Sequence, residues 1–402
     1  MSRIKTINRR DFNHLLRTSF AFPLIAGSLH FPVNEYGTSE NELKNHKIDH
    51  WEIKELNYHW PRPVGKNGRR DVHGQFHKFT AIQLFTDQGA SGWGLTSAGA
   101  SSSAEQLKGK LVSEVFSETT GILDRSLRDF DFALHDLAGK ILDKPVYEML
   151  GSQGAEWTPI YSGMIYLDEL EPPENPAGVD GILENCLWDY EYGFRQLKVK
   201  IGRSGKWYPH DQGLAKDIEV VRTIFNAMGD SIEILVDAND VYSLSDTIAF
   251  MEGIGDIPIF WIEEPFHENR EESVKLKKWL LQNNRSTTLY VDGEANPDHE
   301  LCMELGKEKI LDAYLADIHS FGFTAWRKLM PKLIKDGIQA SPHAWGNLLK
   351  TYYIAHLARG LGNIVTIEGV VCYSDEVNFG NYQISDGKIT PSFAPGFGME
   401  IL

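Results

Sequence analysis

Uninterrupted runs of apolar residues recur along the second half of the chain. Residues 234–236 (Ile-Leu-Val) and residues 259–262 (Ile-Phe-Trp-Ile) are two of them, and a stretch with helical periodicity lies between. A strand buried on both faces of a parallel sheet has such a continuous apolar run, whereas a strand with one wet face alternates. We therefore predict two neighbouring strands of a parallel sheet, joined by a helix.

The same succession of apolar runs and helical stretches extends from residue 159 to residue 368. Hydrophobic residues repeat with helical spacing in residues 213–228, 243–255, 271–283, 299–307, 324–336 and 347–362. Repeated strand–helix units call for parallel strands with right-handed crossovers, and eight such strands close a barrel. No helix is evident after the last strand. The predicted fold class is therefore α/β, a modified TIM barrel of the (β/α)7β kind over residues 156–375.

The pattern before residue 155 is different. Residues 51–56 and 79–86 alternate between apolar and polar, as strands with one exposed face do. Residues 103–116 and 123–150 have helical periodicity, with a stop or kink expected at Lys144-Pro145. Between the two strands, residues 59–70 hold two prolines, two glycines and four cations, which indicates an exposed loop. We predict a separate α+β capping domain over residues 50–155.

The first 32 residues resemble a twin-arginine export signal. Arg9-Arg10 precedes Leu15-Leu16, and an apolar segment too short to span a bilayer follows. Residues 33–49 are polar and predict a linker. We expect an exported, periplasmic protein with no membrane span in its mature form. A basic leader on a cytoplasmic enzyme is the alternative.

Charge and cysteine content narrow the range of partners. The 40 Lys and Arg residues are outnumbered by 56 Asp and Glu, so the net charge is −16. Such an excess of negative charge argues against a nucleic-acid-binding surface, so we predict no nucleic-acid partner. Cys186, Cys302 and Cys372 lie too far apart for a zinc motif or a disulfide framework, and we interpret them as buried thiols.

Seven of the predicted strands end in an ionisable residue. Active sites of β/α barrels lie at the carboxyl ends of the strands. Asp237, Glu263 and Glu294 follow three consecutive strands, so their side chains are expected to converge. Three carboxylates packed together repel one another unless a cation neutralises them, and hard oxygen ligands suit Mg²⁺. We predict Mg²⁺ as the cofactor. The alternative is that these residues only cap strand ends.

Two lysines and a histidine supply candidate acid–base groups. Lys198 and Lys200 are two residues apart on one strand, so both face the same side. Repulsion between them and a nearby metal would lower a lysine pKa towards that of a base. Asp317 and His343 end adjacent strands, where the carboxylate would fix the imidazole tautomer and raise its basicity. A pair of exposed lysines and an isolated polar histidine are the alternatives.

Three further residues are candidates for contact with a substrate. Glu368, at the end of the last strand, is placed to stabilise a developing negative charge. Asn239 points to the same side as Asp237, unless it only forms a turn. His319 follows Asp317 in the next loop and is the third candidate.

In combination, these segments resemble a known family. They are similar to the enolase superfamily, and most similar to its mandelate racemase subgroup, in K-V-K (198–200), V-D-A-N (236–239), W-I-E-E-P (261–265), G-E (293–294), A-D (316–317) and P-H (342–343). The resemblance covers residue 51 to the C-terminus. This chain departs from the family pattern at residues 316–323. It has Ala316-Asp317 where the family usually has Pro-Asp, and Gly322-Phe323 where the family usually has Gly-Gly. The resemblance also implies that residues 376–402 pack on the capping domain, and we expect a homo-oligomer.

The resemblance assigns roles to individual residues. It makes Glu263 the inner metal ligand, whereas Glu264 should point away or hydrogen bond to a neighbour. It makes Lys200 the base and places Lys198 against the carboxylate of the substrate.

The sequence therefore predicts a Mg²⁺-dependent hydro-lyase that dehydrates an acid sugar to a 2-keto-3-deoxy acid. Lys200 or His343 would remove the proton α to the carboxylate, and His343 would protonate the departing hydroxyl. A racemase, epimerase or cycloisomerase acting on a hydroxy or sugar acid is one alternative. A non-catalytic protein that binds a metal and a sugar acid is another. Because a capping loop meets the far end of the substrate, we predict that Arg62 and Arg69 bind a second anionic or strongly polar group there. The alternative is that these cations are solvated or serve a subunit interface.

Overall fold

The computed structural model describes residues 42–402. The predicted export signal and most of the predicted linker lie outside the described residues, so both remain predictions.

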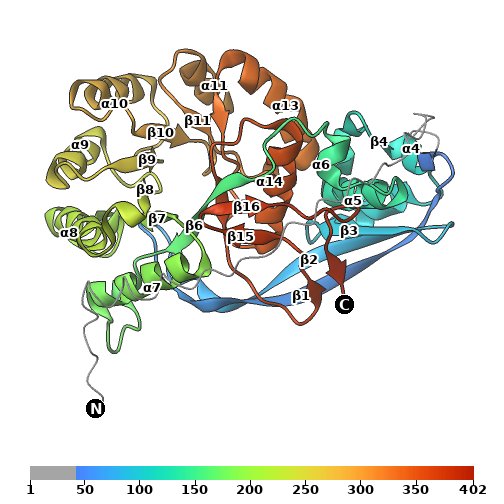
Figure 1. Cartoon of the computed structure of the whole chain (residues 1–402), viewed down its shortest axis with the longest axis horizontal. Coiled ribbons are helices and arrows are strands. Elements are labelled where there is room, and N and C mark those ends of the chain that lie inside the picture. The colour runs from blue at the N-terminus through green and yellow to red at the C-terminus, as the bar shows by residue number, and fades with distance from the viewer. Residues whose placement is uncertain (1–41) are drawn as a thin grey trace, which may run out of the picture. The chain divides into compact units, whose positions relative to one another are not determined.

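Eight parallel strands form the centre of the described chain (Figure 1). Their bounds are β6 (Thr158–Ile165), β7 (Gln196–Lys200), β8 (Glu233–Asp237), β9 (Ile259–Glu263), β10 (Leu289–Asp292), β11 (Ala313–Tyr314), β12 (Gln339–Ala340) and β13 (Ile367–Gly369). Neighbours in sequence pair from β6 to β12, and β13 pairs with β6. Between β12 and the residues just before β13, the Ala340 N–H donates to the Asn363 carbonyl at 3.0 Å, and the Val365 N–H donates to the Ala340 carbonyl at 2.9 Å. Hydrogen bonds therefore connect the strands all the way round, as the predicted barrel requires.

Side chains inside the barrel form a small apolar core of their own. This cluster consists of Tyr161, Leu235, Trp261, Val291, Ala313 and Leu315. Side chains two residues apart on a strand face the same side. Asp237 therefore follows Leu235 on the inner face of β8, and Glu263 follows Trp261 on the inner face of β9. Asp237 and Glu263 therefore lie at the carboxyl end of the apolar core inside the barrel.

Helices follow seven of the eight strands. They are α7 (Gly178–Tyr192), α8 (His210–Met228), α9 (Leu244–Gly253), α10 (Arg270–Gln282), α11 (His299–Lys307), α12 (Ile318–Phe321) with α13 (Phe323–Asp336), and α14 (Leu348–Leu361). The six predicted helical stretches are confirmed, and residues 370–402, all described, contain no helix. The sequence analysis missed α7, because the buried Asp189 interrupts its apolar face.

An N-terminal α+β region, residues 48–149, precedes the barrel. It contains β1 (Ile48–Val64), β2 (Gly74–Thr86), β3 (Ser91–Leu95), α3 (Ala100–Ala104), α4 (Val112–Val115), α5 (Asp131–Ile141) and α6 (Val146–Met149). Both predicted strands are confirmed as parts of β1 and β2, and the predicted break at Pro145 separates α5 from α6. The single helix predicted over residues 103–116 is wrong. The backbone there turns at Gly109, whose φ of 77° is left-handed and ends any helix.

The exposed loop predicted at residues 59–70 is also wrong in its first half. Strand β1 continues to Val64, and Trp60 is only 1% exposed. The regular pairing of β1 with β2 is interrupted between His59 and Val64. Pro61 and Pro63, which have no N–H to donate, fall in that interruption, so the strand tolerates both of them. Proline content alone does not distinguish a strand with such an interruption from an exposed loop.

The C-terminal segment returns along the barrel to the N-terminal region. It contributes β16 (Lys388–Thr390), which pairs antiparallel with β6, and β15 (Gln383–Ser385), which pairs with β16. Strands β14 (Val377–Asn378) and β17 (Glu400–Ile401) pair with each other. Trp93 Nε1 in β3 donates to the Met399 carbonyl at 2.9 Å. Among the described residues, no helix is long and apolar enough to cross a membrane.

Candidate active site

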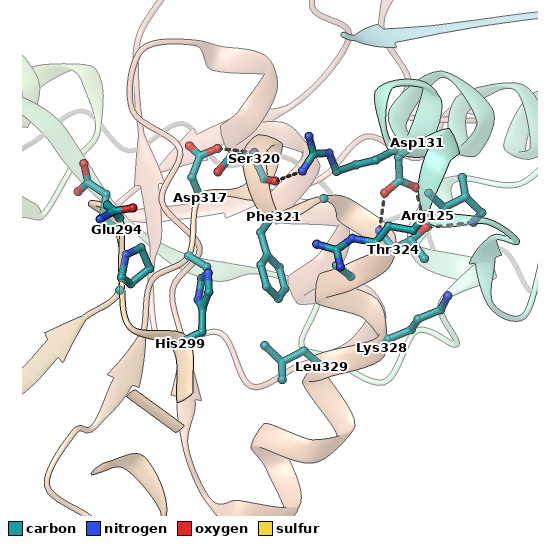
Figure 2. Close-up of a pocket in the computed structure, with 18 residues that line it drawn as sticks. Arg125, Asp131, Glu294, His299, Asp317, Ser320, Phe321, Thr324, Lys328 and Leu329 are labelled. Atoms are coloured by element: carbon teal, nitrogen blue, oxygen red, sulfur yellow. Dashed lines mark hydrogen bonds between the residues drawn. The ribbon is translucent and has the colours of Figure 1, made fainter. Parts of the chain in front are cut away.

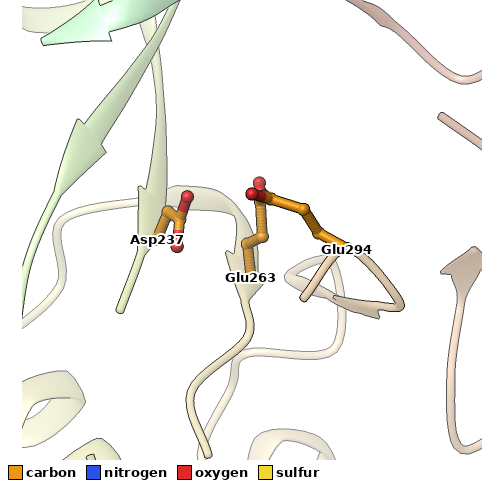
Figure 3. A group of neighbouring side chains, drawn as sticks. All are labelled: Asp237, Glu263 and Glu294. Atoms are coloured by element: carbon orange, nitrogen blue, oxygen red, sulfur yellow. The ribbon is translucent and has the colours of Figure 1, made fainter. Parts of the chain in front are cut away.

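Three carboxylates converge at the ends of neighbouring strands (Figure 3). Asp237 ends β8, Glu263 ends β9, and Glu294 lies two residues beyond β10. One oxygen from each lies within 4.8 Å of the other two. Oε2 of Glu263 and Oε2 of Glu294 are buried without a hydrogen-bond partner among the described residues. Carboxylate oxygens in such a group are the ligands that Mg²⁺ prefers, so the residues fit this cation.

The electrostatics of this group also fit a cation. Burial and the neighbouring Asp237 raise the pKa of Glu263 well above its ordinary value. Burial opposes ionisation of Asp237 too, but Lys200 and Lys198 outweigh it and lower the pKa of Asp237. Buried carboxylates this close together repel one another when they ionise, unless a cation neutralises them. A divalent cation bound here would stabilise the ionised form of Glu263 and so oppose this shift.

Lys198 and Lys200 both reach the carboxylates from β7. Lys198 Nζ lies 2.7 Å from Oε1 of Glu263 and 2.9 Å from Oε1 of Glu368, and Lys200 Nζ contacts Asp237. Burial lowers the pKa of Lys200, but Asp237 outweighs it, so the pKa lies above its ordinary value. The predicted lowering of this pKa assumed a bound metal ion and stays a prediction, because a cation on Asp237 would weaken the hold of that carboxylate on Lys200.

His343 lies on the other side of the carboxylate group. Its Nδ1 is 3.0 Å from Oδ2 of Asp317, and its Nε2 is 3.1 Å from Oε1 of Glu294 and 3.6 Å from Oε2 of Glu368. The structure thus brings the predicted dyad together. Asp317 also binds Lys350, at 2.8 Å, which the sequence analysis did not anticipate. With Nδ1 held by Asp317, Nε2 is the ring atom that faces the site.

Glu368 is held at the centre by two opposite contacts. Its Oε1 lies 2.9 Å from Lys198, and its Oε2 accepts the Ala344 N–H at 2.8 Å. Gly163 on β6 makes the space, because a Cβ there would lie 2.6 Å from Oε1 of Glu368. Burial raises the pKa of Glu368, but Lys198 and His343 reverse this and lower it.

Aromatic rings lie next to the lysines, and the sequence analysis missed them. Lys200 Nζ is 5.4 Å from the ring of Tyr166, and the ring of His73 is 4.9 Å from Tyr166 and 4.7 Å from Trp345. His73 comes from the segment between β1 and β2, so the N-terminal region contributes to this layer. Trp345 follows His343 by two residues, which is the one local signal that sequence offered. Such rings help to exclude water from the site.

The two arginines predicted to bind substrate are engaged elsewhere. Arg62 forms a bidentate pair with the buried Asp189, at 2.8 and 2.9 Å, so its predicted substrate contact does not fit the geometry. Arg69 lies 3.2 Å from Asp240. Asp189 lies on the helix that the sequence analysis missed, so the partner of Arg62 could not be foreseen.

The two remaining candidates lie beside the site. The Asn239 N–H donates to Oδ1 of Asp237 at 2.9 Å, and its φ of 48° is that of a turn residue. Its side-chain Oδ1 is buried without a partner among the described residues. The His319 N–H donates to Oδ1 of Asp317 at 2.9 Å, and its ring stacks on Phe132. Both therefore help to set the shape of the site.

A second acidic group lies next to the first. It consists of Asp240, Glu264 and Asp292. As expected for the second glutamate of its motif, Glu264 is hydrogen bonded to a neighbour, the Ala295 N–H, at 2.7 Å. Burial raises the pKa of both Glu264 and Asp292 well above their ordinary values.

Comparison with known proteins agrees with this geometry. The family described as Enolase C-terminal domain-like matches residues 184–402. A galacturonate dehydratase from Geobacillus sp., solved with D-galacturonate and 5-keto-4-deoxy-D-galacturonate, is 29% identical with a TM-score of 0.83. The match covers 89% of this chain and 95% of that one. A mandelate racemase/muconate lactonizing protein from Geobacillus sp. Y412MC10, complexed with magnesium and tartrate, is 28% identical over 89% of this chain and 94% of that one, also with a TM-score of 0.83.

Curated relatives match over shorter stretches. Arabinonate dehydratase from Saccharolobus solfataricus is 26% identical over 145 residues, which is 36% of this chain and 35% of that protein. A hydrophobic dipeptide epimerase from Enterococcus faecalis is 22% identical over 251 residues, 58% of this chain and 64% of that protein. The chain thus spans about a third of the first relative and less than two thirds of the second.

Proposed function

Because the chain belongs to the Enolase C-terminal domain-like family, we propose that it is a Mg²⁺-dependent hydro-lyase that dehydrates an acid sugar. The observation that carries this proposal is the placement of Lys200 and of the His343–Asp317 dyad around one group of three carboxylates. Removal of an α-proton and departure of a β-hydroxyl need a base and an acid near one carbon skeleton, and this site offers both.

Asp237, Glu263 and Glu294 would hold the Mg²⁺. When bound, the cation would neutralise the carboxylate of the substrate and so make its α-proton more acidic. Lys198, which lies against Glu263 and Glu368, would donate hydrogen bonds to the same carboxylate as negative charge develops on it.

Lys200 and His343 would divide the proton transfers. Lys200 Nζ takes the proton from the α-carbon, and the electron pair of that C–H bond delocalises into the carboxylate. Those electrons then form the double bond between the α- and β-carbons as the β-hydroxyl leaves. His343 Nε2 gives its proton to the hydroxyl, so the product is an enol acid and water. The enol then tautomerises to the keto acid. Asp317 positions the ring throughout, and the rings of Tyr166, His73 and Trp345 keep water away.

The test is turnover of a panel of acid sugars by the full chain with Mg²⁺. The panel starts with D-galacturonate, because the relative that is 29% identical was solved with it, and continues with hexonates and aldarates. We expect loss of one water and a deoxy keto acid by NMR for at least one of them. If no member is dehydrated and none exchanges its α-proton with deuterated solvent, the proposal fails.

A racemase or epimerase is the second candidate. Inversion at one carbon needs one group to remove a proton and a second to return it on the other face, and Lys200 with His343 meets that need. In D₂O, an epimerase gives the inverted acid with one deuterium and no keto product. That outcome would replace dehydration by epimerisation as the function.

A further inference from the structure

The two acid–base groups of the candidate site differ in their access to solvent. The side chain of Lys200 is only 4% exposed, and its contact Asp237 is fully buried. The side chain of His343 is 14% exposed, and its contacts Asp317 and Glu294 are 14% and 18% exposed. Water therefore reaches the His343 side of the site more readily than the Lys200 side.

A cavity of about 920 Å³ lies next to the His343 side. Glu294 and Asp317, which both contact His343, form part of its wall, and so do the exposed Arg125 and Lys328. Figure 2 shows Glu294 and Asp317 towards one end of the cavity, and Arg125 and Lys328 towards the other. The cavity therefore leads from the contacts of His343 to solvent, and Lys200 is not part of its wall.

Aromatic rings cover the Lys200 side. Tyr166, whose ring lies 5.4 Å from Lys200 Nζ, is 2% exposed. The rings of His73 and Trp345 lie 4.9 and 5.3 Å from that of Tyr166. The His73 ring is held there because its Nδ1–H donates to the Gly65 carbonyl at 2.7 Å. Such a cover keeps water away from Lys200 Nζ.

We propose that Lys200 performs a second step, in which it returns the proton taken from the α-carbon to the β-carbon and so converts the enol into the keto acid. This inference rests on the proposed function, which places Lys200 at the α-carbon. The β-carbon is bonded to the α-carbon, so the Nζ that reaches one lies next to the other. Because water is kept away from Nζ, the proton from the substrate is the one available there.

The atoms and electrons of this step balance. An N–H bond of Lys200 breaks, and its proton forms a C–H bond with the electrons of the carbon–carbon double bond. The electrons of the enol O–H bond form the C=O bond, and the proton of that hydroxyl passes to water in the cavity. His343, which gave its proton to the departing hydroxyl, regains one from the same water. Both groups thus return to their starting state.

The position of the new hydrogen distinguishes Lys200 from His343 as its donor. His343 lies across the carboxylate group from Lys200, so the hydroxyl leaves on one face and the Lys200 proton arrives on the other. The full chain with Mg²⁺ and an acid sugar that it dehydrates is therefore tested in D₂O. NMR should show deuterium on the β-carbon with inversion of configuration. Retention of configuration would overturn the inference.

A substrate with deuterium on its α-carbon tests the transfer itself. After turnover in ordinary water, part of that deuterium should lie on the β-carbon of the product. A lysine ammonium carries three hydrogens, so at most about one third of the product molecules should carry it. Product with no transferred deuterium would overturn the inference.

Two variants test the cover. His73→Ala should admit water to Lys200 and lower the transferred fraction by about twofold or more. The matched control is Leu329→Ala, which enlarges the cavity on the His343 side and should leave that fraction unchanged. An equal fraction in both variants would contradict the role given to the cover.

A measurement on keto acids separates this inference from the proposed function. The full chain with Mg²⁺ is incubated in D₂O with 5-keto-4-deoxy-D-galacturonate, which was solved with the relative that is 29% identical, or with 2-keto-3-deoxy-D-gluconate. We expect exchange of one of the two methylene hydrogens next to the keto group, lost in Lys200→Ala and kept in His343→Asn. Such exchange supports the inference even if no acid sugar is dehydrated. Dehydration without this exchange leaves the proposed function in place and overturns the inference.

Discussion

Glu263 shows how strongly a single side chain in this site depends on its neighbours. It is 1% exposed, Lys198 lies 2.7 Å from one oxygen, and the other oxygen has no partner among the described residues. Burial and Asp237 raise its pKa and Lys198 opposes the shift, so the charge of Glu263 depends on the cations around it.

Glu263→Gln should remove the response to Mg²⁺. A glutamine keeps the shape but has no charge to offer the cation, so we expect at least a 100-fold loss of activity, as for other groups that act in the transition state. Thermal unfolding measures the same effect without turnover. A ligand at 100 times its Kd stabilises the folded chain by about 2.7 kcal/mol, and the variant should lose that increment.

Glu264→Gln is the matched control for this measurement. Its side chain would still accept the Ala295 N–H through the amide oxygen. A Glu263→Gln protein that is stabilised by Mg²⁺ as well as the natural chain would contradict the assigned ligand.

Lys200→Ala and His343→Asn should each lower kcat by about 10²–10⁴, the usual contribution of a general acid or base. The two variants should differ in D₂O. His343→Asn keeps Lys200, the group proposed to take the α-proton, and should still exchange that proton. Lys200→Ala should not. Exchange measured by NMR checks this, with Lys278→Ala, an exposed lysine on α10, as the control. Equal exchange in both variants would reverse or remove the division of roles.

The ionisable residues at the strand ends could be predicted from the sequence. The distant residues with which side chains of the site and the N-terminal region pair could not. Asp237, Glu263 and His343 follow apolar runs, so their convergence follows from barrel geometry alone. Lys350 contacts Asp317 across 33 residues, and Arg62 contacts Asp189 across 127 residues. No local pattern specifies such pairs, because they depend on how helices pack outside the barrel.

At the scale of elements, one carboxyl joins the segment after β1 to the segment after β6. Oδ1 of Asp168 accepts the Gly65 N–H at 2.9 Å, and its Oδ2 accepts from Asn185 Nδ2, also at 2.9 Å. Burial raises the pKa of Asp168 from 3.8 to about 6, although Arg62 opposes the shift. The folded chain therefore holds this proton more tightly than the unfolded chain does.

The sign of the resulting pH dependence follows directly. The protonated carboxyl of Asp168 contributes to the free energy of unfolding. This contribution is fully present below pH 3.8 and is lost as the pH rises through 6. We expect Asp168→Asn to remove on the order of 1–3 kcal/mol of this dependence between pH 4.5 and 7.5. Urea unfolding at both pH values measures it, with the exposed Asp375→Asn as the control. An unchanged pH dependence in Asp168→Asn would contradict the assignment.

The hydrophobic pattern of the sequence predicted some helices and strands better than others. Helices with an unbroken apolar face were found almost to the residue, as in α11 (His299–Lys307). Helix α7 was missed because a buried acid interrupts its face. The end of β1 was taken for a loop because its prolines lie where pairing lapses. In both cases tertiary contacts outweigh the local preference on which a sequence-based prediction depends.

At the scale of the whole molecule, the C-terminal segment connects the N-terminal region with the barrel. The ring of Phe397 lies 6.4 Å from Phe132 in α5, 5.5 Å from Phe323 in α13 and 4.5 Å from Tyr353 in α14. Its N–H donates to Oδ1 of Asp136 at 2.8 Å. One residue near the end of the chain thus packs against helices of both regions.

Phe397→Ala should destabilise the protein by about 3–5 kcal/mol, the usual cost of removing a buried phenylalanine ring. Phe393→Ala, four residues earlier and 55% exposed, should have little effect. Chemical unfolding with probes in both regions measures the difference. If Phe397→Ala is as stable as the Phe393 control, the C-terminal segment does not hold the two regions together.

The placement of this segment bears on how a gene of this kind can change. Trp93 and Asp136 lie 306 and 261 residues before their partners Met399 and Phe397. Recombination that replaced only the codons for residues 50–155 would leave a foreign tail against the new helix. Successful exchanges would have to carry the codons for residues 50–155 and 376–402 together. Selection for a new substrate therefore reaches the barrel rim by single-codon changes more easily than by swapping the N-terminal region.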